Sequence, residues 1–355
     1  MPSRRSFLTG LLATGIAPHA SWADVGSPAY MAAAQLPSGA FALLGLSAPG
    51  AAVFQIPLPD RGHAAAAHPN RPLAVAFARR PGRFALVIDC LTGKVEQQLH
   101  APDGYHFYGH GTFSGDGTTL FTTENDYDNA RGMIGLWDVR QGFRRIGAIP
   151  SGGIGPHDIR LMPDGQTLVV ANGGIETHPE TGRLKLNLPE MRPNLSYLSP
   201  DGQVQEQVEP PRNNHMASIR HLAVRADGLI AAACQWQGAE VGIPPLLMTH
   251  QAGQAPQFHD FGQDTLRHMQ GYLGSVAISG DEIAVTGPRG GLAVVTDTSG
   301  RIKRTWQQTD ICGVARAPYG FTFTTGLGRV LADTGQLALS RAHELAWDNH
   351  LIAIG

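Results

Sequence analysis

The chain has few cysteines and almost no excess of charge of either sign. Its three cysteines among 355 residues are too few for a disulfide scaffold, and none follows the C-x2-C spacing of a zinc site. The 27 basic residues are balanced by 29 acidic ones, which argues against a nucleic-acid-binding protein. With 42% hydrophobic residues, the sequence predicts a folded protein of one large domain or two small ones.

Three enzyme motifs are also missing from the sequence. There is no G-x-S-x-G, no G-x-G-x-x-G after a strand of a βαβ unit, and no H-E-x-x-H. These absences weigh against a serine hydrolase and against a protein that binds a nucleotide cofactor. Cys312 is a candidate nucleophile with nearby histidines as bases, and a buried structural thiol is the alternative.

Residues 1–23 have the pattern of an export signal. Arg4 and Arg5 precede a mildly apolar stretch, Leu8 to Ala17, and Ser21-Trp22-Ala23 offers small residues at a cleavage site. The pattern predicts a twin-arginine signal peptide and a periplasmic protein. An uncleaved membrane anchor is the alternative, but a membrane span needs about 20 apolar residues. No other run reaches that length, so no stable membrane insertion is expected.

The three cysteines are expected to be buried free thiols rather than members of a disulfide. Cys90, Cys234 and Cys312 fall in separate copies of the repeat described next. A disulfide would otherwise be favoured in an oxidising periplasm.

The rest of the chain repeats one pattern, in which a turn rich in glycine joins two short apolar strands. Copies cover residues 63–78, 108–123, 155–171, 219–234, 274–287 and 312–325. The 44 glycines and 25 prolines fit many such turns. A period of about 40–45 residues with four strands per unit is typical of a β-propeller.

Two further segments complete the predicted ring. Residues 36–59 and 345–355 contain unassigned strand-like runs, and one blade built from both leaves no exposed strand edge. We therefore predict an all-β fold, a seven-bladed β-propeller over residues 36–355, closed by pairing of the N- and C-terminal strands. Residues 24–35 are expected to form a linker, and six or eight blades are the alternatives.

One repeat copy contains a long insertion. It covers residues 172–196, between Ala171 and Tyr197, and includes several apolar residues. Long loops in compact domains are usually functional or disordered, and this one is expected to fold over one face of the ring.

Five histidines occur at matching places in the repeat, in the strand that lines the channel of a propeller. They are His63, His110, His157, His221 and His350. Some copies place the histidine seven residues before the turn and others eight, so β-bulges are needed to turn every side chain inward. Neutral histidine is the commonest metal ligand and suits copper or iron. The pattern predicts a metal site, and isolated channel-lining histidines are the alternative.

Polar residues near these histidines are candidates to orient the imidazoles or to contact a substrate. They are Glu124, Asp126, Asp158, Arg160, Arg183, Arg220, Cys312 and Asn349. If the three arginines meet at one mouth of the channel, they favour an anionic substrate or a chelated metal over a bare ion. Surface salt bridges are the alternative for each arginine.

Several segments resemble a family of exported bacterial β-propellers described only as a domain of unknown function. The resemblance rests on residues 107–129, 155–188, 220–228, 271–279 and 347–351. It implies kinship with YVTN-type and quinoprotein-amine-dehydrogenase-like propellers. It also implies association with imelysin-like iron-regulated proteins and dihaem thiol-oxidoreductase-like proteins, and hence iron or copper handling. The resemblance supplies no reaction.

Three functions follow as hypotheses. The first is a periplasmic propeller that binds iron or copper for metal acquisition or redox handling. The second is a non-catalytic scaffold that docks an imelysin-like or dihaem partner. The third is a lactonase-like hydrolase, based on the YVTN-type resemblance and on Arg, His and Glu at one mouth. The residues alone leave open whether the chain is an enzyme.

Overall fold

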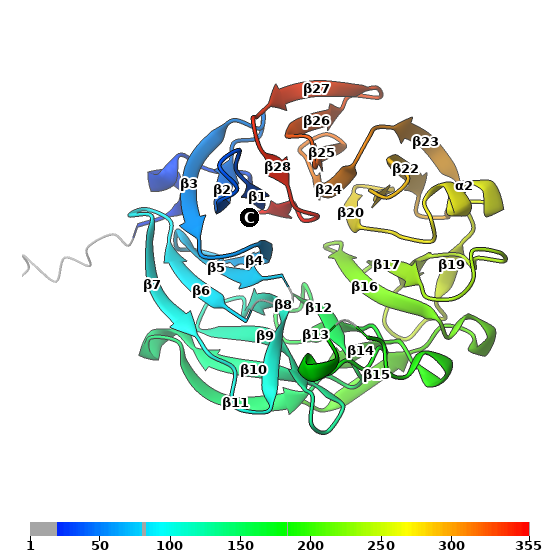
Figure 1. The fold of residues 1–355 in the computed structure, drawn as a ribbon, viewed down its shortest axis with the longest axis horizontal. Coiled ribbons are helices and arrows are strands. Elements are labelled where there is room, and N and C mark those ends of the chain that lie inside the picture. The colour runs from blue at the N-terminus through cyan, green and yellow to red at the C-terminus, as the bar shows by residue number, and fades with distance from the viewer. Residues whose placement is uncertain (1–19, 80–82, 183, 355) are drawn as a thin grey trace, which may run out of the picture.

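Seven antiparallel sheets surround a central axis in the computed structural model, which describes residues 20–79, 83–182 and 184–354 (Figure 1). This arrangement confirms the predicted all-β, seven-bladed propeller. Six of the sheets are formed by four strands that follow one another along the chain. In each of these six, the first strand is the innermost and the fourth is the outermost.

The second, third and fourth blades follow the chain in order. The second contains β4 (Gly62–Ala67), β5 (Leu73–Ala78), β6 (Ala85–Asp89) and β7 (Lys94–Leu99). The third contains β8 (Tyr105–Phe113), β9 (Thr119–Asp126), β10 (Arg131–Asp138) and β11 (Arg144–Pro150). The fourth contains β12 (Pro156–Leu161), β13 (Leu168–Asn172), β14 (Asn194–Leu198) and β15 (Val204–Val208).

The last three blades continue around the ring. The fifth contains β16 (Ala217–Val224), β17 (Ile230–Trp236), β18 (Leu247–His250) and β19 (Gln257–His259). The sixth contains β20 (Ser275–Ser279), β21 (Glu282–Gly287), β22 (Leu292–Asp297) and β23 (Ile302–Gln307). The seventh contains β24 (Ile311–Arg316), β25 (Phe321–Thr325), β26 (Arg329–Asp333) and β27 (Leu337–Ala342).

The first blade joins the two ends of the described chain. Its strands are β1 (Tyr30–Gln35), β2 (Phe41–Leu46), β3 (Ala52–Leu58), β28 (Ala346–Trp347) and β29 (Ile352–Ala353). Ala34 of β1 pairs with Trp347, and Tyr30 pairs with Ala353. The predicted closure is therefore present. The structure differs from the linker expected over residues 24–35, because residues 30–35 form β1, in which every residue but Gln35 is buried.

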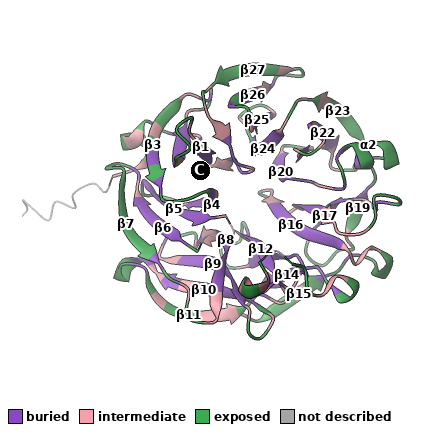
Figure 2. Cartoon of the chain, viewed as in Figure 1, coloured by how far each residue is buried: buried purple, intermediate pink, exposed green. Residues whose placement is uncertain are grey.

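Burial falls from the axis to the rim of each blade (Figure 2). Every residue of β5 is buried, because neighbouring blades cover both faces of the strand. In the outermost strand β7, only Leu99 is buried. Apolar runs in the sequence thus mark buried strands inside a blade, and polar or charged runs mark its outermost strand. Turn glycines have positive φ at the expected places, for example +73° at Gly117 and +69° at Gly165.

The insertion of the fourth blade lies between β13 and β14. It contains two short helices, η3 (Pro179–Thr181) and η4 (Leu188–Glu190), and is anchored by the buried Ile175 and Met191. It contacts the ring near the start of the inner strands, where Thr177 hydrogen-bonds with the Tyr108 hydroxyl at 3.2 Å. This agrees with the expectation that the insertion folds over one face.

The cysteines and the N-terminal segment complete the description of the chain. All three cysteines are buried free thiols, as predicted. Among the described residues, no helix is both long and apolar enough to cross a membrane. Of the predicted signal peptide, residues 1–23, the first 19 residues lie outside the described part of the chain. Next to its expected end, the indole N–H of Trp22 donates to the His68 carbonyl at 2.9 Å.

The closing segment should contribute strongly to stability. Trp347 of β28 is 4% exposed in a cluster formed by residues from both ends of the chain. The change Trp347→Ala should lower the free energy of unfolding by about 3–5 kcal/mol, because it leaves a cavity in the closing blade. Chemical denaturation measures this. The matched change Leu339→Ala, at a side chain that is 59% exposed, should stay within about 0.5 kcal/mol. Equal effects of the two changes would contradict closure by this segment.

Candidate metal centre

Five imidazoles meet at the channel axis, one from each of five consecutive blades. They belong to His350, His63, His110, His157 and His221, in ring order, and form the histidine cluster. Ring centroids of neighbouring members lie between 4.4 Å, for His63 and His350, and 5.0 Å, for His63 and His110. The histidines expected near one end of the channel are thus in mutual contact.

Irregularities in the inner strands direct these side chains to the axis. The pairing register shifts across the histidine in β4, β8 and β12, and directly before His221 in β16. Such bulges rotate a side chain away from ordinary strand alternation, as the uneven spacing of the histidines before the turns required. His350 lies instead in the break between β28 and β29. Gly109 allows the close approach of β8, because a Cβ there would lie 2.8 Å from the His63 ring.

Three of the five histidines are buried and two are partly buried, and burial sets the charge of four of the rings. His110, His221 and His350 are at most 4% exposed. Burial lowers the pKa of His63 to about 4 and lowers the pKa of His157, His221 and His350 well below the usual value. Nearby positive charge adds to the effect, chiefly Arg220 at His157. At neutral pH these rings are therefore uncharged, which is the form of histidine that binds metals.

Four ring nitrogens of the cluster are buried and have no hydrogen-bond partner among the described residues. They are Nδ1 of His63, His157 and His221 and Nε2 of His110. Buried polar atoms in proteins are nearly always paired, so this concentration needs an explanation. Two overlapping groups have ligand atoms within 4.8 Å of one another, and both contain His110. The groups are His63, His110, His350 and His110, His157, His221.

Asp158 fixes the orientation of His110. Its Oδ1 lies 3.2 Å from His110 Nδ1, so Nδ1 donates and Nε2 keeps its lone pair for another partner. The carboxylate also accepts the backbone N–H groups of Ile159 and Leu222, each at 2.9 Å. Burial alone would raise the pKa of Asp158, but Arg160 and His110 hold it below its usual value. Asp158 therefore stays ionised behind the imidazole.

Asp348 occupies a similar place behind His63. Its Oδ1 lies 3.7 Å from His63 Nδ1, and the carboxylate accepts from Arg61 Nε at 2.6 Å and Arg79 Nη1 at 2.9 Å. Although burial opposes it, His63 and the two arginines lower the pKa of Asp348. On the other side of the ring, His63 Nε2 lies 3.3 Å from His350 Nε2. Asp348 thus supplies negative charge behind this pair of imidazoles.

A cavity of about 100 Å³ opens onto the cluster at the end of the ring where the inner strands begin. We call this end the channel mouth. It is lined by His63, Arg79, Tyr108, His157, His221, Gln235, Tyr272 and Asn349. A small ligand can therefore reach three of the five histidines without displacing the fold.

The other predicted site residues separate into two groups. Asp158, Arg160, Arg220 and Asn349 lie at or beside the cluster. Glu124 is bound within the third blade by Arg145 at 2.6 and 2.7 Å, and Asp126 by Arg131 at 2.6 Å. Arg183 lies outside the described residues.

Cys312 lies on an inner strand but keeps its proton. Burial raises the pKa of its thiol to about 12, and Sγ lies 3.5 Å from the carbonyl oxygens of Thr324 and Asp348. This environment supports the structural thiol rather than the nucleophile.

Sequence reasoning missed Asp348 and Arg79. Asp348 stands two residues before His350, within the string Trp347-Asp348-Asn349-His350, so its proximity to a histidine was a usable signal. Arg79 follows β5 and reaches the site only through its contact with Asp348 from another blade. No local signal in the sequence marks Arg79.

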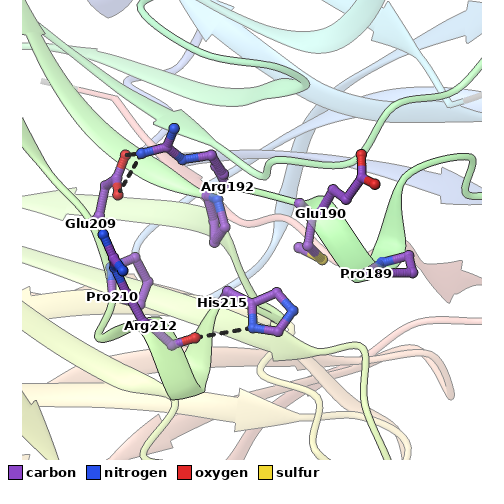
Figure 3. Close-up of a pocket in the computed structure, with 9 residues that line it drawn as sticks. Pro189, Glu190, Arg192, Glu209, Pro210, Arg212 and His215 are labelled. Atoms are coloured by element: carbon purple, nitrogen blue, oxygen red, sulfur yellow. Dashed lines mark hydrogen bonds and ion pairs between the residues drawn. The ribbon is translucent and has the colours of Figure 1, made fainter.

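A second hollow, of about 370 Å³, lies beside the insertion and contains none of the five histidines. Figure 3 shows its lining, in which Arg192 pairs with Glu209 at 3.3 Å and His215 Nδ1 donates to the Arg212 carbonyl at 3.1 Å. Neither group of described side chains that could hold a metal ion lies in this hollow.

Comparisons with known proteins identify a family and a fold. A family model described as "Protein of unknown function (DUF1513)" matches residues 56–354. A search of curated protein sequences finds no match. A solved structure of hydrazine synthase from Kuenenia stuttgartiensis is similar, with a TM-score of 0.59 and 13% identity over 92% of this chain and 98% of that chain. At this identity, the likeness concerns the fold alone.

The buried neutral histidines should make the metal-free protein sensitive to mild acid. The unfolded chain takes up protons near pH 6.5, whereas folded His63 does so only near pH 4. Stability should therefore fall as pH drops from about 6.5 to about 4, with His63 contributing on the order of 2–3 kcal/mol. Thermal unfolding in a chelator at several pH values measures this.

A matched pair of variants tests the origin of that acid sensitivity. His63→Gln should flatten the dependence of Tm on pH, and His100→Gln, at an exposed histidine, should leave it unchanged. A Tm that does not change between pH 7 and pH 5 in the wild type would contradict a buried neutral cluster.

Proposed function

The chain belongs to the DUF1513 family, and we propose that it is a periplasmic β-propeller that binds a transition-metal ion, copper or iron, through its histidine cluster. The role that follows is metal acquisition or redox handling. The proposal starts from the chemistry of the cluster and from the export signal predicted over residues 1–23.

The observation that carries the proposal is a set of three buried ring nitrogens without hydrogen-bond partners among the described residues, His110 Nε2, His157 Nδ1 and His221 Nδ1. The fourth such nitrogen, His63 Nδ1, faces Asp348 Oδ1 at 3.7 Å. Leaving one buried polar group unpaired costs about 1–3 kcal/mol, so three in one place are expensive. A metal ion satisfies several lone pairs at once and does not require any ring to be protonated. Proteins retain such a cost mainly where it serves binding or catalysis.

The positions of the nitrogens suit a common ion. His110 Nε2, His157 Nδ1 and His221 Nδ1 belong to residues whose ligand atoms lie within 4.8 Å of one another. The 3.3 Å between Nε2 of His63 and Nε2 of His350 also fits. Two imidazoles on one tetrahedral ion, at about 2.0–2.1 Å each, place their nitrogens roughly 3.3–3.4 Å apart. Asp158 is placed to orient His110 while it binds.

The donor set favours copper over iron. The cluster offers imidazole nitrogens, and its two carboxylates, Asp158 and Asp348, lie behind histidines and are held by arginines. Non-haem iron sites commonly include a carboxylate among the ligands, whereas an all-nitrogen set suits copper, and copper binds such sites most strongly among first-row divalent ions. The hydrolase hypothesis weakens for a separate reason, because Glu124 pairs with Arg145 and does not line the cavity at the channel mouth.

Metal analysis of the exported protein tests the proposal. Protein exported through its own signal and purified without chelators should carry close to one or two equivalents of copper or iron. The double change His110→Ala and His157→Ala should reduce this below about a tenth, because it removes ligands from both overlapping groups. Elemental analysis gives the amount, and the visible spectrum of the copper-loaded protein reports imidazole ligation.

Controls separate loss of ligands from loss of fold. His100→Ala with His268→Ala removes two exposed histidines and should leave the metal content unchanged. Circular dichroism should show both double variants folded, and His110→Gln with His157→Gln serves if the alanine pair misfolds. Folded wild-type protein that carries no metal and takes up none from added copper or iron would refute the proposal.

A further inference from the structure

We infer that the export leader is cut between Ala20 and Ser21, so that Trp22 stays in the exported protein as part of the folded ring. The pattern of residues 1–23 predicts a cut after Ala23, which would remove Trp22. The inference rests on the export signal invoked in the proposed function and does not depend on the metal. The reaction is a hydrolysis by an export endopeptidase, in which water adds across the peptide bond and leaves a carboxylate on Ala20 and an amine on Ser21.

The bond after Ala23 lies inside the first helix that the structure describes, η1 (Trp22–Val25). Both polar groups of this bond are hydrogen-bonded within the helix. The N–H of Asp24 donates to the Ser21 carbonyl at 3.0 Å, and the Ala23 carbonyl accepts the N–H of Gly26 at 3.2 Å. Gly26 has a φ of +86°, the left-handed conformation that commonly ends a helix. A peptidase therefore reaches this bond only after η1 has opened.

Trp22 holds η1 against the ring. Its indole N–H donates at 2.9 Å to the carbonyl of His68, in the turn between β4 and β5. Trp22 and Val25 also pack on a buried cluster formed by the first and second blades. The backbone at Gly26 approaches β3, because a Cβ there would lie 3.4 Å from Cβ of Val53. The helix thus bridges two blades, and removal of Trp22 would expose apolar surface at their boundary to water.

Ser21 is suited to be the first residue of the exported chain. Its backbone N–H and its hydroxyl both donate to Asp24 Oδ2, at 2.7 and 3.0 Å. These two bonds lower the pKa of Asp24, so the carboxylate is charged at neutral pH. A cut before Ser21 turns the N–H into an ammonium group, and its hydrogen bond becomes an ion pair. A cut after Ala23 would instead separate Asp24 from Ser21 and destroy the cap of the helix.

The order of folding and export gives this protection its effect. A twin-arginine signal is typical of chains that fold before export, so the peptidase would meet η1 in its folded state. Ala20 precedes the helix and its cap, and it belongs to no helix or strand. It also offers the small side chain that export peptidases prefer before a cut. The bond after Ala20 can therefore be cut while η1 stays docked.

N-terminal sequencing and intact mass of the periplasmic protein, produced from the full chain with its own leader, test the inference. The exported chain should begin at Ser21. A chain that begins at Asp24 would overturn the inference and leave export intact. Full-length chain confined to the cytoplasm would refute both the cut and the export on which it rests. The metal content of the same protein is a separate result and tests the histidine cluster alone.

A matched pair of variants tests the position of the cut through the preference of the peptidase. Ala20→Phe places a large side chain before the inferred bond and should slow processing at least tenfold in a pulse-chase experiment. Ala23→Phe does the same for the alternative bond, at an exposed side chain, and should be processed at the wild-type rate. The reverse pattern would place the cut after Ala23 and refute the inference.

Trp22→Ala gives a readout in the folded exported protein. The change should lower Tm by about 3–5 °C, because it removes the hydrogen bond to His68 and packing at the blade boundary. Ala23→Ser, at an exposed neighbour, is the matched control and should leave Tm unchanged. Equal Tm values for the wild type and Trp22→Ala would contradict a place for Trp22 in the exported ring.

Discussion

The gathering of five imidazoles in mutual contact at the channel axis is the constraint on which the rest of this structure depends. Protonation of two neighbouring rings would place like charges about 5 Å apart. Burial and this repulsion lower the pKa of His63, His157, His221 and His350, so these four rings are neutral and each has a lone pair to satisfy. The bulges in four inner strands and the lack of a side chain at Gly109 allow the rings to approach one another this closely.

Charged side chains are arranged in layers around the imidazole rings. Two buried carboxylates, Asp158 and Asp348, lie directly behind His110 and His63. Arginines lie behind the carboxylates in turn, with Arg160 on Asp158 and Arg61 and Arg79 on Asp348. Because each carboxylate is held by arginine and by backbone N–H groups, it stays ionised behind its histidine.

Much of the fold was predictable because each blade has a local sequence pattern that recurs along the chain. Turn glycines and apolar pairs of strands identify the blades, and the apolar character of Ala346–Trp347 and Leu351 shows that the tail belongs inside the ring. The histidines were predictable because they recur at one place in that repeat. The partners were harder, since Arg79 reaches Asp348 across a blade boundary and more than 250 positions of sequence. Glu124 shows the opposite case. It lies near His110 in the sequence, but its side chain pairs with Arg145 of its own blade.

The source of His350 links the site to the topology of the ring. Four members of the cluster come from blades that are complete within one stretch of chain, but His350 lies in the segment that returns to pair with β1. A chain that has not closed therefore has at most four of the five imidazoles. An ion bound by His350, His63 and His110 would link the C-terminal segment to the second and third blades. Among the described sheets, only the first blade pairs distant parts of the chain, so this ion would stabilise that closure. A fully occupied centre would then require a closed ring, and loss of the ion would destabilise the ring first where β28 and β29 pair with β1.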